Sequence, residues 1–303
     1  MRKAQASGGA DYKGLVDAVK AKLIMQANET AANANIVKSK YYKYLESLCH
    51  ANGINIATIK KDAKEATELE MYFGGLPVLV GLKYFTELRC LRIFGQDIKS
   101  LKPLSEVAAT LDELWLCEGK LKDISGIESC ILLRRLYLYE NEIVDGKPLS
   151  KLVNLDTLWL MENQLMDLSF LSGMMYLTNL NLASNRLTDK GLKAVQRWPD
   201  KLEVVDLSGN DIINYQSIYP LSKCTMLRSV YFRHTAYKPC PLTNNDRYLW
   251  WMAYHFQNLE SLDDDSVTDT TRAALTVTLK YLLSGGHKSP THRSNISQYS
   301  HKN

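Results

Sequence analysis

The segment "LDTLWLMENQL" (155–165) alternates two kinds of apolar side chain, and this alternation decides the fold. One apolar set consists of Leu155, Leu158, Leu160 and Leu165. Successive side chains of a strand face opposite sides. If the leucines face a core, Trp159 and Met161 project from the other side of the strand. The placement of a tryptophan on that side requires an explanation.

Similar segments recur along the chain with a regular spacing. The three steps between Leu111 and Leu177 are each 22 residues long. The copies begin at Leu88, Leu111, Leu133, Leu155, Leu177, Leu202 and Leu227, and a degenerate first copy begins at Ala66. Their shared pattern, L-x-x-L-x-L-x-x-N-x-L, is the leucine-rich repeat, in which each copy forms one strand, a turn and a return segment. One copy cannot bury its leucines alone, so the copies stack.

Stacked copies predict an α/β fold, a leucine-rich-repeat solenoid with the shape of a horseshoe. We expect a parallel concave sheet of about 7–8 short strands, a 3₁₀ or irregular convex side, and helical caps at both ends. Two buried columns are predicted, namely Leu114, Leu136, Leu158, Leu180 and Leu116, Leu138, Leu160, Leu182. Asparagines that end the strands should hydrogen-bond the turning backbone. They are Asn141, Asn163, Asn185 and Asn210, whereas Gln96, Gly119 and Thr235 replace them towards the ends, where we expect a weaker ladder.

Breaks in the period divide the chain into four parts. We assign residues 1–65 to an N-terminal helical extension and cap, 66–243 to the repeats, 244–285 to a C-terminal cap and helix, and 286–303 to a disordered tail. The long return over 187–202 predicts one α-helix that Pro199 ends.

Two helices are expected in the N-terminal part. Leu15, Val19 and Leu23 have helical spacing, and so do the apolar residues over 37–48. A left-handed cap at Asn52-Gly53 should end the second helix, which then covers the first repeat. The first helix either docks on a partner or stays mobile.

The strand positions between the leucines line the concave surface. The copies that begin at Leu111, Leu133 and Leu155 place an aromatic patch there, edged by glutamates. Such rings pack partly on one another, but each can bury about 150–250 Å², and half-exposed rings would leave roughly 400–600 Å² uncovered. That is at or above the largest patch on a typical monomer, which favours a protein-binding surface. The predicted partner-binding residues are Arg92, Phe94, Glu113, Trp115, Glu118, Arg135, Tyr137, Tyr139, Glu140, Trp159, Met161, Glu162, Asp206, Tyr231 and Arg233.

Composition and motifs disfavour other functions. The six scattered cysteines include no C-x-x-C pair, which indicates neither a zinc site nor a disulfide framework. No apolar run is long enough for a membrane span, and no secretory signal is visible, so we expect a cytoplasmic protein. The common nucleotide-binding, hydrolase and metalloprotease motifs are absent. We therefore expect no catalysis, no cofactor and no metal.

The net charge of +4 is unevenly placed. Residues 1–65 hold 11 Lys/Arg against 6 Asp/Glu, and residues 284–303 hold 3 Lys/Arg and no acidic residue, so the part between them is mildly acidic. A nucleic-acid binder needs a basic stripe. The charge pattern therefore disfavours nucleic acid as a partner.

The aromatic and acidic 22-residue repeats resemble the class typified by the regulatory subunit of protein phosphatase 1. "YHFQNLESLDDDSVT" (254–268) is similar to the C-terminal cap of that class. Residues 46–265 resemble more closely the first repeat block of the family of leucine-rich repeat-containing protein 9. The similarity is specific in "GGLPVLVGL" (74–82) and in the order of Trp115, Tyr137 and Trp159.

The second resemblance implies an adaptor of the ciliary axoneme or microtubule cytoskeleton, because that family is associated with cilia or flagella. The concave face would hold a helix or loop of another protein. The implied partner is an axonemal protein or tubulin, whose acidic surface the basic N-terminal flank would contact. Two alternatives stay open. One is regulation of protein phosphatase 1 through the same face, and the other is a splicing-type adaptor similar to the repeat protein of a small nuclear ribonucleoprotein.

Overall fold

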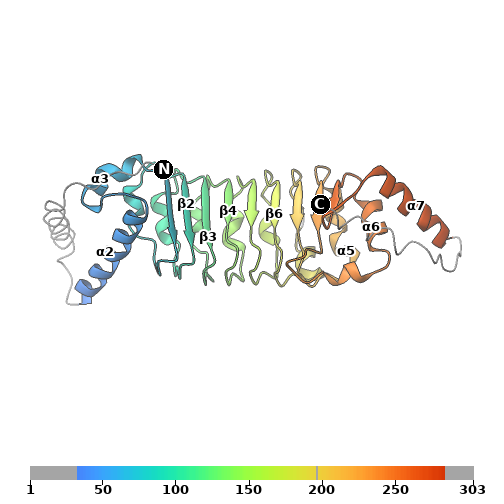
Figure 1. Ribbon diagram of the computed structural model, residues 1–303, viewed down its shortest axis with the longest axis horizontal. Coiled ribbons are helices and arrows are strands. Elements are labelled where there is room, and N and C mark those ends of the chain that lie inside the picture. The colour runs from blue at the N-terminus through green and yellow to red at the C-terminus, as the bar shows by residue number, and fades with distance from the viewer. Residues whose placement is uncertain (1–32, 196, 284–303) are drawn as a thin grey trace, which may run out of the picture.

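The computed structural model describes residues 33–195 and 197–283, which form one elongated solenoid (Figure 1). The strands stand side by side in a single row, with helices at both ends. The predicted α/β repeat solenoid is confirmed. The first predicted helix, around residues 15–23, and the predicted tail lie outside the described residues. Within the described part, no helix is long and apolar enough to cross a membrane.

Ten strands form one sheet, in which they follow one another in chain order. The eight repeat strands run parallel and are β1 (Glu68–Tyr72), β2 (Cys90–Phe94), β3 (Glu113–Cys117), β4 (Arg135–Tyr137), β5 (Thr157–Trp159), β6 (Asn179–Asn181), β7 (Val204–Asp206) and β8 (Ser229–Tyr231). The C-terminal cap adds β9 (Ser261–Leu262), which pairs parallel to β8, and β10 (Asp265–Ser266), which turns back against β9. The cap thus prolongs the repeat sheet.

The strand register aligns equivalent repeat positions, and this alignment builds the core. Leu136 lies opposite Leu114 on one side and Leu158 on the other, and all three are fully buried. The second predicted column, formed by Leu116, Leu138, Leu160 and Leu182, is buried as well. Each strand therefore has one face in a close-packed core and one face on the concave surface.

The asparagine ladder joins neighbouring repeats through the backbone. The Nδ2 of Asn163 donates to the carbonyl oxygens of Leu138 (2.9 Å) and Leu160 (3.1 Å), while its Oδ1 accepts a hydrogen bond from the Ile143 N–H (3.0 Å). Equivalent bonds are made by Asn141, Asn185 and Asn210. Each asparagine bridges two repeats, so its side chain fixes their stacking.

Two other polar side chains act towards the ends of the ladder. The Oε1 of buried Gln96 accepts a hydrogen bond from the Leu76 N–H in the first repeat. In the C-terminal cap, Asp263 accepts hydrogen bonds from the Phe232 N–H (2.8 Å) and the Tyr248 hydroxyl (2.7 Å). These contacts offset part of the expected weakening of the ladder.

Most return segments on the convex side are short 3₁₀ helices, as predicted. They are η3 (Leu82–Tyr84), η4 (Lys102–Glu106), η5 (Ile127–Ser129), η6 (Lys147–Lys151), η7 (Ser169–Leu171), η8 (Tyr219–Lys223) and η9 (Pro241–Asn244). Two returns contain α-helical turns, α4 (Asp189–Lys193) and α5 (Tyr215–Ile218). The helix predicted over 187–202 is therefore shorter than expected and ends before Pro199. Gly191 in its middle disfavours a longer helix, and α5 was not expected.

Helices cover both ends of the core. The N-terminal cover consists of α2 (Asn33–Ala51), η1 (Ile56–Thr58), α3 (Ile59–Asp62) and η2 (Ala63–Glu65). Gly53 ends α2 with a φ of 67°, the left-handed cap predicted from the sequence. At the other end lie α6 (Tyr248–His255) and α7 (Asp269–Leu283). In and after α6, Tyr248, Met252 and Phe256 are buried against the last repeat.

Candidate interaction surface

Five aromatic rings on neighbouring strands form a continuous row on the concave side. We call this row the aromatic ladder, and its members are Tyr72, Phe94, Trp115, Tyr137 and Trp159. From β1 to β5 the ring centroids lie 5.1, 5.9, 3.6 and 5.1 Å apart. Tyr139 adds an edge contact to Trp115 at 6.5 Å. The structure thus brings five of the predicted residues and Tyr72 into one surface.

Exposure decides which of these rings a partner could touch. Tyr72 is 53% exposed and the adjacent Phe73 is 71% exposed. Trp115 and Trp159 are half-buried. Tyr137 is only 9% exposed, because the nearly parallel ring of Trp115 covers it. Tyr137 was predicted to contact a partner, but in the structure it mainly supports its neighbours.

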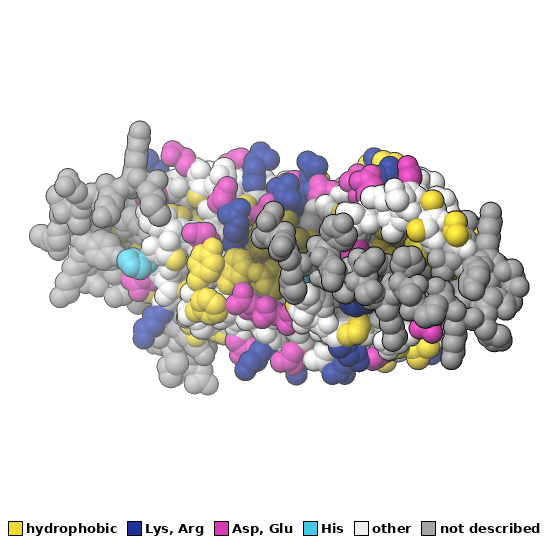
Figure 2. Space-filling view, turned by 45° about the vertical axis from the view of Figure 1, so that its right-hand side comes forward, with side chains coloured by type: hydrophobic (Ala, Val, Ile, Leu, Met, Phe, Trp, Pro, Cys, Tyr) yellow, Lys and Arg dark blue, Asp and Glu magenta, His cyan; other side chains and the backbone are white. Residues whose placement is uncertain are grey.

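The aromatic ladder has a different border on each side. Figure 2 shows a hydrophobic patch with acidic side chains along one side and mainly basic side chains along the other. One border lies where the strands begin and the other where they end, since the ladder crosses the strands. The two borders differ in how their charges are paired.

Charged groups at the strand-start border pair with one another. Arg92 contacts Glu68 (2.7 Å) and Glu113 (3.3 Å). Arg135 contacts Glu113 (2.6 Å) and Asp112 (2.9 Å). Arg92, Glu113 and Arg135 were all predicted to bind a partner. In the structure they form an ion-pair network of their own.

Glu113 links this network to the ladder. Its Oε1 accepts a hydrogen bond from the Trp115 indole N–H at 2.6 Å. Partial burial acts to raise the pKa of Glu113, but hydrogen bonds from Trp115 and Arg135 outweigh it and lower the pKa to about 2. The carboxylate is therefore charged at neutral pH and fixes the orientation of the Trp115 ring.

Three exposed glutamates stand at the strand-end border, and we call them the glutamate row: Glu118, Glu140 and Glu162. Their φ angles are 56°, 53° and 55°, so all three adopt the left-handed conformation that is uncommon outside glycine. Partial burial and the neighbouring charges of Glu162 and Glu118 raise the pKa of Glu140. The row is thus a repeated backbone feature that places like charges side by side.

Met161, two residues after Trp159, is half-buried, whereas the three other predicted residues lie apart from the aromatic ladder. Asn181 follows Trp159 in the register and ends the row of rings. Asp206 accepts hydrogen bonds from the Ser208 N–H and hydroxyl, and burial raises its pKa. Arg233 points to Asp263 of the cap, with 3.8 Å between the charged atoms. Tyr231 is half-buried on β8. The structure therefore separates Asp206, Tyr231 and Arg233 from the aromatic group.

The sequence prediction missed part of the surface. Tyr72 and Phe73 extend the patch by one strand, but their repeat was treated as degenerate. Counting back 22 residues from Phe94 would have found Tyr72. Phe73 lies directly on Gly95, where an added Cβ would come within 2.1 Å of the phenylalanine ring. Tyr237, which donates a hydrogen bond to Glu162 (3.0 Å), has no equivalent in the repeat pattern.

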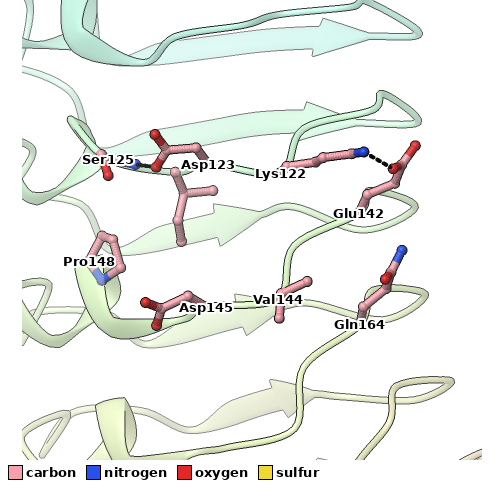
Figure 3. A pocket seen from close by; sticks show the side chains of 9 residues that line it. Lys122, Asp123, Ser125, Glu142, Val144, Asp145, Pro148 and Gln164 are labelled. Carbon is pink, nitrogen blue, oxygen red and sulfur yellow. Dashed lines mark hydrogen bonds and ion pairs between the residues drawn. The ribbon is translucent and has the colours of Figure 1, made fainter.

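A polar hollow of about 370 Å³ lies elsewhere, beyond the strand ends (Figure 3). Lys122 and Glu142 form an ion pair in it (3.1 Å), and the Ser125 N–H donates to Asp123 (2.8 Å). Its lining contains no cysteine or histidine. On the concave side, burial raises the pKa of the Cys117 thiol to about 12, so this group is protonated at neutral pH. Among the described residues, no group of three or more His, Cys, Asp or Glu side chains could hold a metal.

Comparisons with known proteins agree with this architecture. A family model described as Leucine Rich repeat matches residues 173–195, which span β6 and α4. Internalin C2 from Listeria monocytogenes is similar in structure, with a TM-score of 0.52 and 26% sequence identity. The similarity covers 61% of this chain and 81% of the internalin.

The protein has the leucine-rich-repeat fold. A leucine-rich-repeat protein of Leptospira interrogans is also similar, with a TM-score of 0.51 and 20% identity over 69% of this chain and 57% of its own length. At that identity the likeness concerns the fold alone. Within this fold, the aromatic ladder lies on the concave sheet, in repeats one to five.

Proposed function

We propose that this protein is a non-enzymatic scaffold that binds another protein through the concave surface centred on the aromatic ladder. One observation carries the proposal, namely the continuous row of rings across five neighbouring strands, in which every ring except Tyr137 is exposed or partly exposed. Exposed apolar patches of this kind mark interaction sites, and aromatic side chains are enriched among the residues that dominate binding. Solenoid folds use their concave sheets as extended binding surfaces.

The ion-pair network adds to this argument. Glu113 and Arg135 hold Trp115 in place before any partner binds. A side chain that is already ordered loses less conformational entropy on binding. A fixed tryptophan with a partly exposed ring is therefore well suited to anchor a partner.

The finer proposal is an adaptor of the ciliary axoneme or microtubule cytoskeleton, located in a cilium or flagellum. Its support is the sequence resemblance over residues 46–265. The basic N-terminal flank offers a contact for acidic tubulin, and an axonemal protein is the other candidate partner. The tagged protein should stay with detergent-extracted axonemes of ciliated cells. A diffuse protein that is absent from extracted axonemes would contradict this location.

The scaffold proposal is tested by affinity purification with mass spectrometry. The wild-type protein should retain partners that Trp159→Ala loses. Met175→Ala is a matched control, because Met175 is 67% exposed and lies outside the concave strands. Recovery of the same partners by all three proteins would overturn the proposal. Recovery of the catalytic subunit of protein phosphatase 1 would instead support regulation of that enzyme through the same aromatic and acidic surface, and spliceosomal proteins would support the splicing alternative.

A further inference from the structure

The glutamate row differs from the other charges around the aromatic ladder. At the strand-start border, Arg92 and Arg135 neutralise the acidic groups. At the strand-end border, no lysine or arginine of the described residues forms an ion pair with Glu118 or Glu140, and Glu162 receives only the Tyr237 hydroxyl. The concave surface thus has an apolar centre, one neutralised side and one side of unpaired negative charge.

The arrangement of the row is dictated by the backbone. Each glutamate follows its strand at the same repeat position and has the same left-handed φ. Neighbouring strands lie about 4.8 Å apart, so three carboxylates are held at nearly that spacing. Like charges so close repel one another, and the raised pKa of Glu140 reflects this in part. A cationic partner would relieve the repulsion.

Helix geometry matches this spacing. An α-helix rises 1.5 Å per residue, so side chains at i, i+4 and i+7 recur every 4.5–6.0 Å along one face. The helical side chains at i and i+7 lie about 10.5 Å apart along the axis. The first and third glutamates, two strands apart, are separated by about 9.6 Å. In an extended segment, side chains on one face recur about every 6.6 Å. After two repeats, the third side chain of an extended segment would therefore lie about 3.6 Å beyond the third glutamate.

We propose that the concave surface binds an amphipathic helix of another protein, which lies across the strands with a stripe of lysine or arginine along the glutamate row. This inference rests on the proposed function and specifies its partner. The apolar stripe of the helix packs on Trp115, Trp159 and Met161. Its basic stripe, about 100° further round the helix, faces Glu118, Glu140 and Glu162. Charge complementarity sets the partner apart from acidic peptides and from nucleic acid, whose phosphates the row would repel.

Two synthetic peptides test the proposal. The first is a helical peptide with leucine at i, i+4 and i+7 and lysine at i+1, i+5 and i+8, and the second has glutamate in place of each lysine. Fluorescence anisotropy with the full chain should show binding of the lysine peptide, weakened by added salt. The glutamate peptide should bind at least about ten-fold more weakly, since three exposed charge pairs are lost and three repulsions are gained.

Variants locate the effect. E118Q/E140Q/E162Q should abolish the difference between the two peptides, whereas E65Q/E87Q/E203Q, with the same change in charge at exposed sites away from the row, should preserve it. Equal affinities of the two peptides for the wild-type chain would overturn the inference. The scaffold proposal would survive that result if Trp159→Ala still lost its cellular partners, so the two failures are distinguishable.

Two other occupants of the surface are outcomes of the same experiment. The chain's own segment around Leu15, Val19 and Leu23 also carries lysines, at Lys13, Lys20 and Lys22. If V19D/L23D in the full chain raises the affinity for the lysine peptide ten-fold or more, that segment is the occupant and the inference is overturned. A dimer in sedimentation experiments that Trp159→Ala dissociates would assign the surface to a second copy and would overturn it as well.

Discussion

Leu158 and Trp159 are adjacent in β5 but face opposite sides of the sheet, which makes them a sharp test of the surface. Leu158 has no exposed area and lies between Leu136 and Leu180 in the register. Hydrogen bonds to strands on both sides hold this backbone in place, so the core has little freedom to collapse around a smaller side chain. Leu158→Ala should therefore lower the free energy of unfolding by about 3–5 kcal/mol.

Trp159→Ala should have a smaller effect on stability than Leu158→Ala. The indole is half-buried, and its ring contact is an edge-to-face one with Tyr137 at 5.1 Å and 82°. An aromatic pair of this kind contributes about 0.5–1.5 kcal/mol beyond the area it buries. The covered part of the indole adds to this, but its removal from the surface leaves no closed cavity of the kind that Leu158→Ala creates. The same change should lower partner affinity by about 2 kcal/mol or more, as for a central aromatic anchor.

Urea unfolding monitored by circular dichroism measures both variants, and Thr157→Ala on the same strand serves as the control for the concave face. Repeat proteins can unfold in stages, so the midpoint and the slope of the transition are compared together. The expected order of stability is wild type, then Trp159→Ala, then Leu158→Ala. If Trp159→Ala destabilises the protein as much as Leu158→Ala, the assignment of core and concave faces is wrong in β5 and in the neighbouring strands.

Three further substitutions test the supporting structure by urea unfolding. Asn163→Ala removes the acceptor for the buried Ile143 N–H and should lower the free energy of unfolding by about 2–3 kcal/mol. The control Asn154→Ala, at an exposed position, should cost less than about 1 kcal/mol. Equal effects would refute the stabilising role of the asparagine ladder. Folding lowers the pKa of Glu113 from 4.5 to about 2, so its carboxylate stabilises the fold above pH 4.5 and this contribution is lost as the pH falls towards about 2. Glu113→Gln should remove this pH-dependent contribution. Parallel pH profiles of variant and wild type would contradict this. Gly126→Ala should lower the free energy of unfolding by more than about 1 kcal/mol, because the φ of Gly126 is 107° and a Cβ would lie 2.7 Å from the Leu101 backbone. Gly173→Ala should be tolerated, because the nearest atom to its Cβ would be 3.6 Å away.

Much of the fold follows from the sequence, because the period fixes the position of each residue within its repeat. A strand position either faces the core or the concave surface, and the spacing of Leu158 and Leu160 decides which. The same reasoning placed Trp159 on the concave side and Asn163 at the turn. It failed where local composition mattered more than the period, as in the return containing Gly191, where the predicted helix is cut short.

The pairing of side chains was decided only by the tertiary structure. The period places Tyr137 and Arg92 on the concave surface but does not show that Trp115 covers the tyrosine or that Glu68 and Glu113 neutralise the arginine. Those partners lie more than 20 residues away along the chain, and rotamers and ion pairs depend on what the neighbouring repeat presents at the same height. The period also places Glu118, Glu140 and Glu162 in one row, but only the stacked backbone reveals their shared left-handed conformation. A repeat sequence therefore determines which face a residue occupies, whereas contact between repeats determines whether that residue is free to bind.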